Sequence, residues 1–327
     1  MDVERNWIAV TGGSGFIGRR VVEMLLAAGH RVVIISRSRP FIQGLDVALA
    51  QGQARLIAKS EPHPEDLRGI GSIILLAGIA HRATRSTSIS DHIEINTLLN
   101  MRTACVALEA GCARLVFVSS IAVHGCFATS APIDRSTPIR PTTAYAASKW
   151  YAEQCLEAIA RSSGVKLVTV RPPLVFAAHA PGTIARLRSA IARRLPLPFG
   201  SIRNRRSILA LDDLATLLMA ASISQLEGSV LLYPASPNPV STPDIVRALA
   251  KSIGINANMF RLNSSILKFC LDMIPYQRQL GLQLLGDLRI QDTETEFALS
   301  WRPRQNPLSI DSELIQINAN NGSTSCG

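Results

Sequence analysis

The sequence predicts an α/β protein with a doubly wound parallel sheet and a smaller, partly helical second domain. Three observations lead to this prediction. Up to Pro172, short aliphatic and β-branched segments alternate with helical patterns. These short segments are apolar throughout, which is typical of parallel strands buried on both faces. A glycine-rich turn follows the first segment and leads into a helix.

Six segments carry the strand pattern, and helical patterns separate most of them. The expected strands are Asn6–Val10, Arg31–Ile35, Ser72–Ala77, Arg114–Ser119, Lys166–Arg171 and Ser229–Tyr233. The expected helices are Arg19–Ala28, Asp91–Gly111, Tyr145–Ser163 and Asp212–Ser224. The first helix has apolar residues at helical spacing, and Gly29 suits the position just after its end.

The pattern changes after Pro172, where proline and arginine become frequent and strand signals thin out. The expected division is a first domain of residues 1–172 and 207–233 and a second of residues 173–206 and 234–310. Residues 242–285 are mainly helical in pattern, with Thr242 as the expected cap before Pro243. Residues 311–327 are small and polar and are expected to be a disordered tail.

The composition is that of a globular protein. Of the 327 residues, 47% are hydrophobic and 18% are charged, which argues against disorder. No apolar run approaches the roughly 20 residues that cross a bilayer, and the N-terminus lacks a signal-peptide pattern. The six cysteines have no metal-like spacing and are interpreted as reduced thiols. We therefore expect a cytoplasmic protein with no metal site and no stable membrane insertion.

The positive charge is concentrated in one stretch. The net charge is +10, and no acidic residue occurs between Glu157 and Asp212, a stretch with ten Lys or Arg residues. Seven of them are arginines between Arg186 and Arg206. This pattern indicates either a solvated basic face or a site for an anionic ligand such as a sugar diphosphate. Nucleic acid is disfavoured as a partner because interleaved aromatic residues are missing.

The turn Thr11-Gly-Gly-Ser-Gly-Phe-Ile-Gly18 is typical of a dinucleotide-binding Rossmann domain. Gly12 permits the tight turn, Gly15 lets the backbone approach a pyrophosphate, and Gly18 lets the helix pack on the strand. The N–H groups and the dipole at the helix start would then face the phosphates.

The residues after the second strand favour NADP over NAD. An acidic residue there would bind the ribose 2′-hydroxyl of NAD. This chain has Ser36 followed by Arg37 and Arg39, and a guanidinium favours a 2′-phosphate. Alternatively, Arg37 stacks on the adenine or faces solvent.

Tyr145 and Lys149 form a candidate catalytic pair, because residues four apart on a helix share a face. A free tyrosine has a pKa near 10, and a neighbouring ammonium and the positive nicotinamide would favour the phenolate and lower that pKa. Lys149 could also hold the ribose hydroxyls of the cofactor. Ser120, at the end of a strand, could donate a hydrogen bond to a substrate oxygen.

Together these motifs resemble the extended short-chain dehydrogenases/reductases of the NAD-dependent epimerase/dehydratase family. The resemblance runs from about Ile8 to Pro307. It rests on the glycine turn and on the segments Leu75–His81, Phe117–Gly125, Tyr145–Lys149, Arg171-Pro-Pro and Arg205–Asp213.

The resemblance implies roles for individual residues. Ser120, Tyr145 and Lys149 would be the catalytic triad. The cofactor would be bound by Gly12, Gly15, Phe16, Ile17, Gly18, Ser36, Arg37, Leu76, Ala77, Gly78, Tyr145, Lys149 and Pro172. Arg206 would clamp the substrate diphosphate beside Arg205. His81 and His124 would each either approach the substrate or have a structural role. Relatives often pair as homodimers through the helices Asp91–Gly111 and Tyr145–Ser163.

The leading functional hypothesis is an NAD(P)-dependent oxidoreductase that acts at C4 of a UDP-sugar as a 4-ketoreductase. Three segments, Arg171–Val175, Leu195–Gly200 and Asn204–Ser207, are similar to bacterial reductases of UDP-4-keto-6-deoxy-N-acetylglucosamine in surface-polysaccharide precursor synthesis. The alternative is a UDP-hexose 4-epimerase. A non-catalytic dinucleotide sensor is a third hypothesis, which the intact catalytic triad argues against.

Four further features have structural interpretations. Asp212 and Asp213 resemble catalytic acids, but an aspartate that opens a helix is expected to be an N-cap. Asn96 is a candidate to brace the active-site helix. The apolar stripe of a later helix is assigned to core packing rather than to a membrane or a partner; it consists of Ile266, Leu267, Phe269, Cys270 and Ile274.

Overall fold

The computed structural model describes residues 6–80, 88–273, 278–292 and 294–309. A seven-stranded sheet dominates it, in the order β3-β2-β1-β4-β5-β6-β9, and all neighbouring strands are parallel. The strands are β1 Trp7–Thr11, β2 Arg31–Ile35, β3 Ala54–Ile57, β4 Ile70–Leu75, β5 Arg114–Val118, β6 Lys166–Val170 and β9 Ser229–Leu232.

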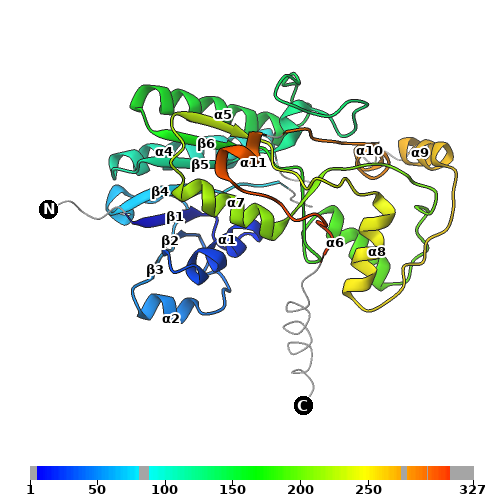
Figure 1. The fold of residues 1–327 in the computed structure, drawn as a ribbon, viewed down its shortest axis with the longest axis horizontal. Helices are drawn as coiled ribbons and strands as arrows, with labels where there is room; N and C mark the ends of the chain where they lie inside the picture. The colour runs from blue at the N-terminus through cyan, green and yellow to red at the C-terminus, as the bar shows by residue number, and fades with distance from the viewer. Residues whose placement is uncertain (1–5, 81–87, 274–277, 293, 310–327) are drawn as a thin grey trace, which may run out of the picture.

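Helices cover both faces of this sheet (Figure 1). On one face, α1 (Phe16–Ala27) and α7 (Leu211–Ile223) bury strand residues such as Val10 and Ile34. On the other face, α4 (Leu99–Glu109) and α5 (Ala144–Ser163) bury the alternate residues, such as Ala9 and Phe117. Because successive strand residues point to opposite faces, a strand covered on both sides must be apolar throughout. The predicted doubly wound sheet is confirmed.

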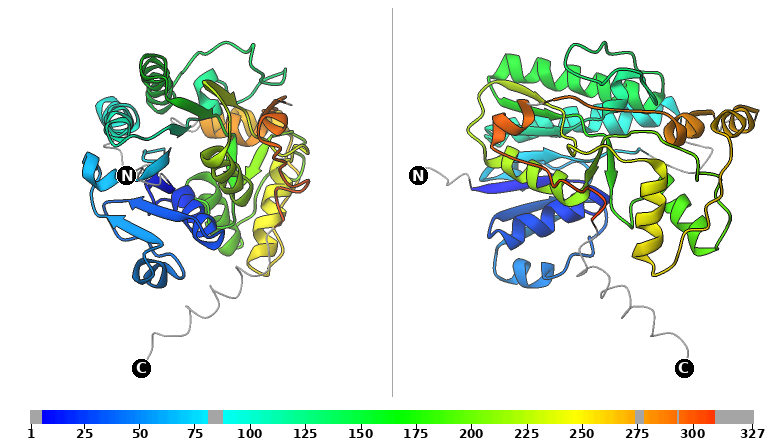
Figure 2. Two further views of the ribbon diagram at one scale, coloured as in Figure 1. Left: turned by 60° about the vertical axis from the view of Figure 1, so that its left-hand side comes forward. Right: turned by 45° about the vertical axis from the view of Figure 1, so that its right-hand side comes forward.

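The second domain lies beyond the carboxyl ends of the strands (Figures 1 and 2). At its border with the large sheet lies a two-stranded parallel sheet of β7 (Leu174–Phe176) and β8 (Ile208–Ala210), in which Ile208 packs into the core of the second domain and Leu209 into the core of the large sheet. The helices of the second domain are α6 Thr183–Ala192, α8 Thr242–Ser252, α9 Ser264–Met273 and α10 Arg278–Leu285. The remaining elements are α2 Leu45–Ala50, η1 Pro64–Leu67, α3 Ile89–His92, the π-helical η2 Ile93–Leu98, η3 Ile121–His124 and α11 Glu294–Leu299.

The six predicted strands are all present, but the sequence analysis missed β3, β7, β8 and α6. β3 lies at the edge of the sheet and includes Arg55, so it lacks the continuous apolar pattern of the inner strands. β7 and β8 have three residues each, too few to show a pattern. The predicted helix Asp91–Gly111 is divided into α3, the π-helical segment and α4.

Two predicted helix caps are wrong. The cap of α8 is Ser241, whose hydroxyl accepts from the backbone N–H of Asp244, so Thr242 is the first helical residue. α7 begins at Leu211, which places Asp212 and Asp213 inside its first turn. The Asp213 carboxylate accepts instead from Arg304 Nε at 2.9 Å.

The core assignment of the apolar stripe on α9 is wrong for most of its residues. Leu267 is buried, whereas Ile266, Phe269 and Cys270 are exposed. Ile274 lies outside the described residues.

The chain returns to the first domain near its C-terminus. α11 packs against α7, and Trp301 is buried in the core that α1, α7 and the sheet share. Trp301 Nε1 donates to Thr216 Oγ1 at 3.0 Å. The segment from about residue 294, which the sequence analysis assigned to the second domain, therefore packs on the helical layer of the large sheet.

Candidate active site

The glycine turn lies at the carboxyl end of β1, between β1 and α1. Gly12 has a positive φ of 66°, and Gly15 is the N-cap of α1. Since Gly15 has no side chain to cap the helix, the first N–H groups of α1 are available to an anion. The neighbouring strand β4 is on the other side of β1 from β2, so the turn lies at the point where the strand order reverses. The donor set and the backbone geometry fit a dinucleotide pyrophosphate.

The end of β4 packs directly on this turn. Thr11 Oγ1 accepts from the backbone N–H of Leu76 at 2.9 Å and of Ala77 at 3.0 Å. A Cβ atom at Gly12 would lie 3.1 Å from the Ala77 nitrogen. A Cβ atom at Gly78 would lie 3.5 Å from Lys149 Nζ. The structure thus brings the predicted cofactor residues of β4 together with both the glycine turn and the catalytic helix.

Gly18→Ala is expected to lower the affinity for a dinucleotide by at least about tenfold, because the turn must open to admit a methyl group. An added Cβ atom would lie 2.2 Å from the Gly12 carbonyl oxygen and 3.0 Å from the Gly13 Cα, which are both backbone atoms. Titration calorimetry with NAD and NADP measures the loss. Gly29→Ala is unsuitable as a control because of its positive φ; Ala27→Gly in the last turn of α1 serves instead.

On the adenosine side, Ser36 and Arg37 differ in accessibility. Ser36 is buried, donates to the Ser38 carbonyl at 2.8 Å and shares a hydrogen bond with the Ser14 hydroxyl at 2.7 Å. Arg37 is exposed. Arg39 forms an ion pair with Asp46. Arg37 is therefore the accessible cation of this segment.

The catalytic triad residues meet at the carboxyl end of β5. Ser120 follows β5, and its hydroxyl hydrogen-bonds with Tyr145 at the start of α5. Burial raises the pKa of Tyr145, and the hydrogen bond with Ser120 acts in the opposite direction. In the chain alone, removal of the phenol from water dominates; the lowering expected from Lys149 together with a positive nicotinamide stays a prediction.

Lys149 is buried one helical turn after Tyr145. Its Nζ donates to the Val118 carbonyl at 2.9 Å and lies 4.9 Å from the centroid of the Phe117 ring. Burial lowers the pKa of Lys149 to about 8, although the Glu153 carboxylate raises it. Lys149 is therefore mainly charged at neutral pH and loses its charge as the pH passes 8.

Asn96 braces the catalytic helix, as the sequence suggested. It lies in the π-helical segment, fully buried, and its Nδ2 donates to Ser148 Oγ at 2.9 Å and to the Ile79 carbonyl at 3.0 Å. Its Oδ1 accepts from the Ile79 N–H at 2.7 Å. These bonds join the β4 loop to α5 beside Lys149.

His124 lies in a buried polar network behind the triad, which argues against its predicted contact with substrate. It is 2% exposed, and its Nε2 lies 3.1 Å from the Tyr233 hydroxyl. Arg171 donates to that hydroxyl and to both carboxylate oxygens of Glu153. Glu153 also accepts from the hydroxyl of Ser119, which precedes the catalytic serine. Burial, with the Arg171 charge, lowers the pKa of His124, so the imidazole is neutral.

The remaining predicted residues are dispersed. Pro172 lies beside the triad, because its carbonyl accepts from the Ile121 N–H at 3.0 Å. His81 lies outside the described residues. Arg205 is exposed, whereas Arg206 is buried in the second domain. Arg206 Nη1 donates to the carbonyls of Phe127, Leu282 and Gly286, at 3.1, 3.4 and 2.7 Å. Burial lowers the pKa of Arg206 to about 10, and Asp287 acts in the opposite direction.

Arg206→Met is expected to lower the free energy of unfolding by about 2–4 kcal/mol without any ligand, because three partly buried carbonyls lose their donor and this cost exceeds the burial penalty of the guanidinium that is removed. Arg205→Met is the matched control and should change stability by less than about 0.5 kcal/mol. Denaturant unfolding of both variants measures this difference. Equal stabilities would show that the Arg206 side chain is free to serve the substrate alone.

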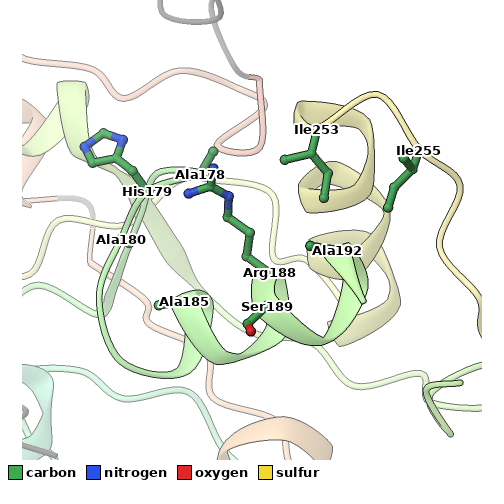
Figure 3. A pocket seen from close by; sticks show the side chains of 9 residues that line it. All are labelled: Ala178, His179, Ala180, Ala185, Arg188, Ser189, Ala192, Ile253 and Ile255. Carbon is green, nitrogen blue, oxygen red and sulfur yellow. The ribbon is translucent and has the colours of Figure 1, made fainter. Parts of the chain in front are cut away.

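Two cavities lie in the second domain, and the triad lines neither of them. The larger has a volume of about 470 Å³, between α6, the end of α8 and the loop of His179. Figure 3 shows Arg188 reaching from α6 toward that loop. The smaller has a volume of about 260 Å³ and is mainly apolar, lined by Thr183, Arg186, Leu187, Leu197, Pro198, Phe199, Leu267, Leu271 and Leu284. Both cavities are bordered by arginines of the basic stretch.

Comparison with known proteins gives a consistent result. The model of the NAD dependent epimerase/dehydratase family matches residues 8–228. A UDP-glucose 4-epimerase of Vibrio cholerae is 25% identical over 303 residues, which are 91% of either chain. A 4-hydroxy-2-methyl-3-oxo-4-farnesyl-3,4-dihydroquinoline-1-oxide ketoreductase of Stigmatella aurantiaca is 31% identical over 184 residues, 56% of this chain and 54% of that protein.

Solved structures share the fold over nearly the whole chain. MoeE5 in complex with UDP-glucose and NAD has a TM-score of 0.76 at 21% identity, with 97% of this chain and 99% of that chain covered. A UDP-N-acetylglucosamine 4-epimerase of Methanobrevibacter ruminantium has a TM-score of 0.75 at 17% identity, with 97% and 99% covered. At these identities the likeness establishes the fold.

Proposed function

The chain belongs to the NAD dependent epimerase/dehydratase family, and from this premise we propose that it transfers hydride at C4 of a UDP-sugar. The observation that carries the proposal is the convergence of Ser120, Tyr145 and Lys149 beside the glycine turn. A non-catalytic dinucleotide sensor would need the turn but not a proton-transfer group. Two observations support a UDP-sugar as the proposed substrate: the activities and ligands for which the relatives are named, and the arginines of the basic stretch that border the two cavities.

In this proposal, the nicotinamide ring, when bound, supplies or accepts the hydride. Tyr145 protonates the alkoxide oxygen that forms at C4 during reduction, or removes the hydroxyl proton during oxidation. Ser120 holds the same oxygen by a hydrogen bond and so orients it toward Tyr145. The Lys149 ammonium stabilises the tyrosinate form of Tyr145, which is the product of proton donation during reduction and the proton acceptor during oxidation. After reduction, solvent returns a proton to Tyr145; after oxidation, Tyr145 releases its proton to solvent.

Within this chemistry, the sequence signatures favour a 4-ketoreductase. The Vibrio cholerae relative, which aligns over nearly the whole chain, favours a UDP-hexose 4-epimerase as the second candidate. The stoichiometry of the cofactor distinguishes the two. A reductase consumes one NAD(P)H per 4-keto sugar, whereas an epimerase interconverts UDP-glucose and UDP-galactose without net consumption. Activity with neither class of UDP-sugar would contradict the proposal.

We further propose NADP as the preferred cofactor, because Arg37 is the accessible cation at the end of β2. NAD is the alternative, and it is the cofactor in the MoeE5 complexes. Arg37→Ala is expected to lower kcat/KM for NADPH by roughly tenfold and to change that for NADH by less than twofold, since only NADPH has a 2′-phosphate. Steady-state kinetics with both cofactors measure this. An equal loss for both would place Arg37 on the adenine instead.

A further inference from the structure

Helix α9 has one buried face and one exposed apolar face. Leu267 and Leu271 pack against the core of the second domain. Ile266, Phe269 and Met273 are 53%, 66% and 67% exposed. Because these three residues are spaced i, i+3 and i+7, they lie on the same side of the helix. Large apolar side chains that gather on one side mark an interaction surface, unlike single exposed ones.

Two further exposed apolar residues lie on the segments that follow α6 and precede α9. Phe260 and Leu195 are 44% and 47% exposed. Their segments lie side by side, because Phe260 N–H donates to the Leu197 carbonyl at 3.1 Å and Leu197 N–H to the Asn258 carbonyl at 2.9 Å. We call these five exposed residues the α9 surface. Figures 1 and 2 both show α9 at the end of the molecule farthest from the large sheet, where it projects outward.

The charge around the α9 surface is mainly positive, and Asp272 within α9 is the exception. The chain has no acidic residue from position 245 to position 271, a stretch with four Lys or Arg residues, and none from 158 to 211. Arg261 and Lys268 are exposed before and within α9. Arg186 lines the cavity beneath α9, and the Arg194 carbonyl accepts from Asn258 Nδ2 at 3.5 Å, next to the Phe260 segment. The two acid-free stretches therefore meet at this surface.

We propose that the α9 surface docks this protein on the face of an anionic lipid membrane. Its apolar side chains would enter the boundary between headgroups and acyl chains, and the flanking arginines and lysines would contact the anionic headgroups. A flat membrane can accept a projecting helix without a complementary groove. The contact is peripheral, since within the described part of the chain no helix is long and apolar enough to cross a bilayer.

Vesicle sedimentation tests this proposal with the full chain. Wild-type protein is expected to sediment with vesicles of phosphatidylcholine containing about 30% phosphatidylglycerol, and weakly with phosphatidylcholine alone. The double variant Phe269→Ser/Met273→Ser should reduce the bound fraction roughly fivefold or more. Arg261→Gln/Lys268→Gln should reduce binding to the anionic vesicles and lessen its dependence on salt.

Phe297→Ser is the matched control, because Phe297 is 83% exposed on α11, on the first domain. It should leave vesicle binding unchanged. All variants alter exposed side chains, so equal melting temperatures confirm that they are folded. Absence of binding to anionic vesicles would overturn the proposal, as would binding that survives Phe269→Ser/Met273→Ser. A dimer that dissociates only in that double variant would assign the surface to a second copy of the chain and would also overturn it.

Discussion

Tyr145→Phe is expected to lower kcat by roughly 10²–10⁴-fold, with KM for the UDP-sugar changed by less than about threefold. The variant retains the ring of Tyr145 and its edge contact with the His92 ring, with centroids 6.4 Å apart. It removes only the hydroxyl that Ser120 bonds. The proton at C4 then has no positioned donor or acceptor, so chemistry becomes rate-limiting. Single-turnover kinetics with the accepted UDP-sugar measure the loss directly.

Tyr151→Phe is the matched control for this variant. Tyr151 lies on the same helix and is 51% exposed, so the loss of its hydroxyl should leave kcat within about twofold. If Tyr145→Phe turned over every accepted UDP-sugar at the wild-type rate, the proton-transfer mechanism would be wrong.

Lys149→Met is expected to abolish most activity and at the same time to stabilise the protein in the absence of nucleotides. The lowering of the Lys149 pKa from 10.5 to about 8 means that the buried ammonium opposes folding, by an amount on the order of 3 kcal/mol. Methionine fills a similar volume without this cost, and the Val118 carbonyl loses its donor, which offsets part of the gain. Thermal unfolding at pH 7 should therefore occur a few degrees higher in the variant.

The pH dependence gives the sign of this effect. Below pH 8 the lysine is charged in both the folded and the unfolded chain, so its full burial cost destabilises the fold. Between pH 8 and pH 10.5 the folded lysine is neutral while the unfolded one is still charged, and this destabilisation decreases until it disappears near pH 10.5. The stability gain of Lys149→Met should shrink over the same interval. Lys166→Met is the control, since Lys166 forms a surface ion pair with Glu227. A less stable Lys149→Met protein at pH 7 would contradict the assignment of Lys149 as a strained functional group.

Features encoded by neighbouring residues could be predicted, and features made by distant ones could not. The strand β2, the glycine turn and the Tyr145–Lys149 pair depend on local patterns of apolar residues, glycines and helical spacing. The partners of Arg206 are 76 to 80 residues away in sequence. The side-chain partners of His124 are Pro138, Arg171 and Tyr233, and no local sequence pattern predicts these contacts.

The exposed face of α9 was mispredicted for a related reason. An apolar stripe at helical spacing shows that a helix has an apolar side. It does not show how many residues of that side the core of the protein covers. In this chain the core accepts Leu267 and Leu271, and the side with Phe269 remains in solvent. The sequence also contains a stretch without acidic residues, from 245 to 271. This stretch indicates a basic interaction surface only when it is known that the apolar side of α9 is exposed.

The return of the C-terminal segment has a consequence for biosynthesis. Trp301 fills the core of the first domain, and the Arg304 backbone N–H and Nε bond Asp213 at 3.0 and 2.9 Å. When residues 1–233 have left the ribosome, all strands of the large sheet are present, but Trp301 and Arg304, which pack on its helical layer, are not yet available. The first domain can finish folding only after the second has left the exit tunnel, so the two domains mature together, not one after the other.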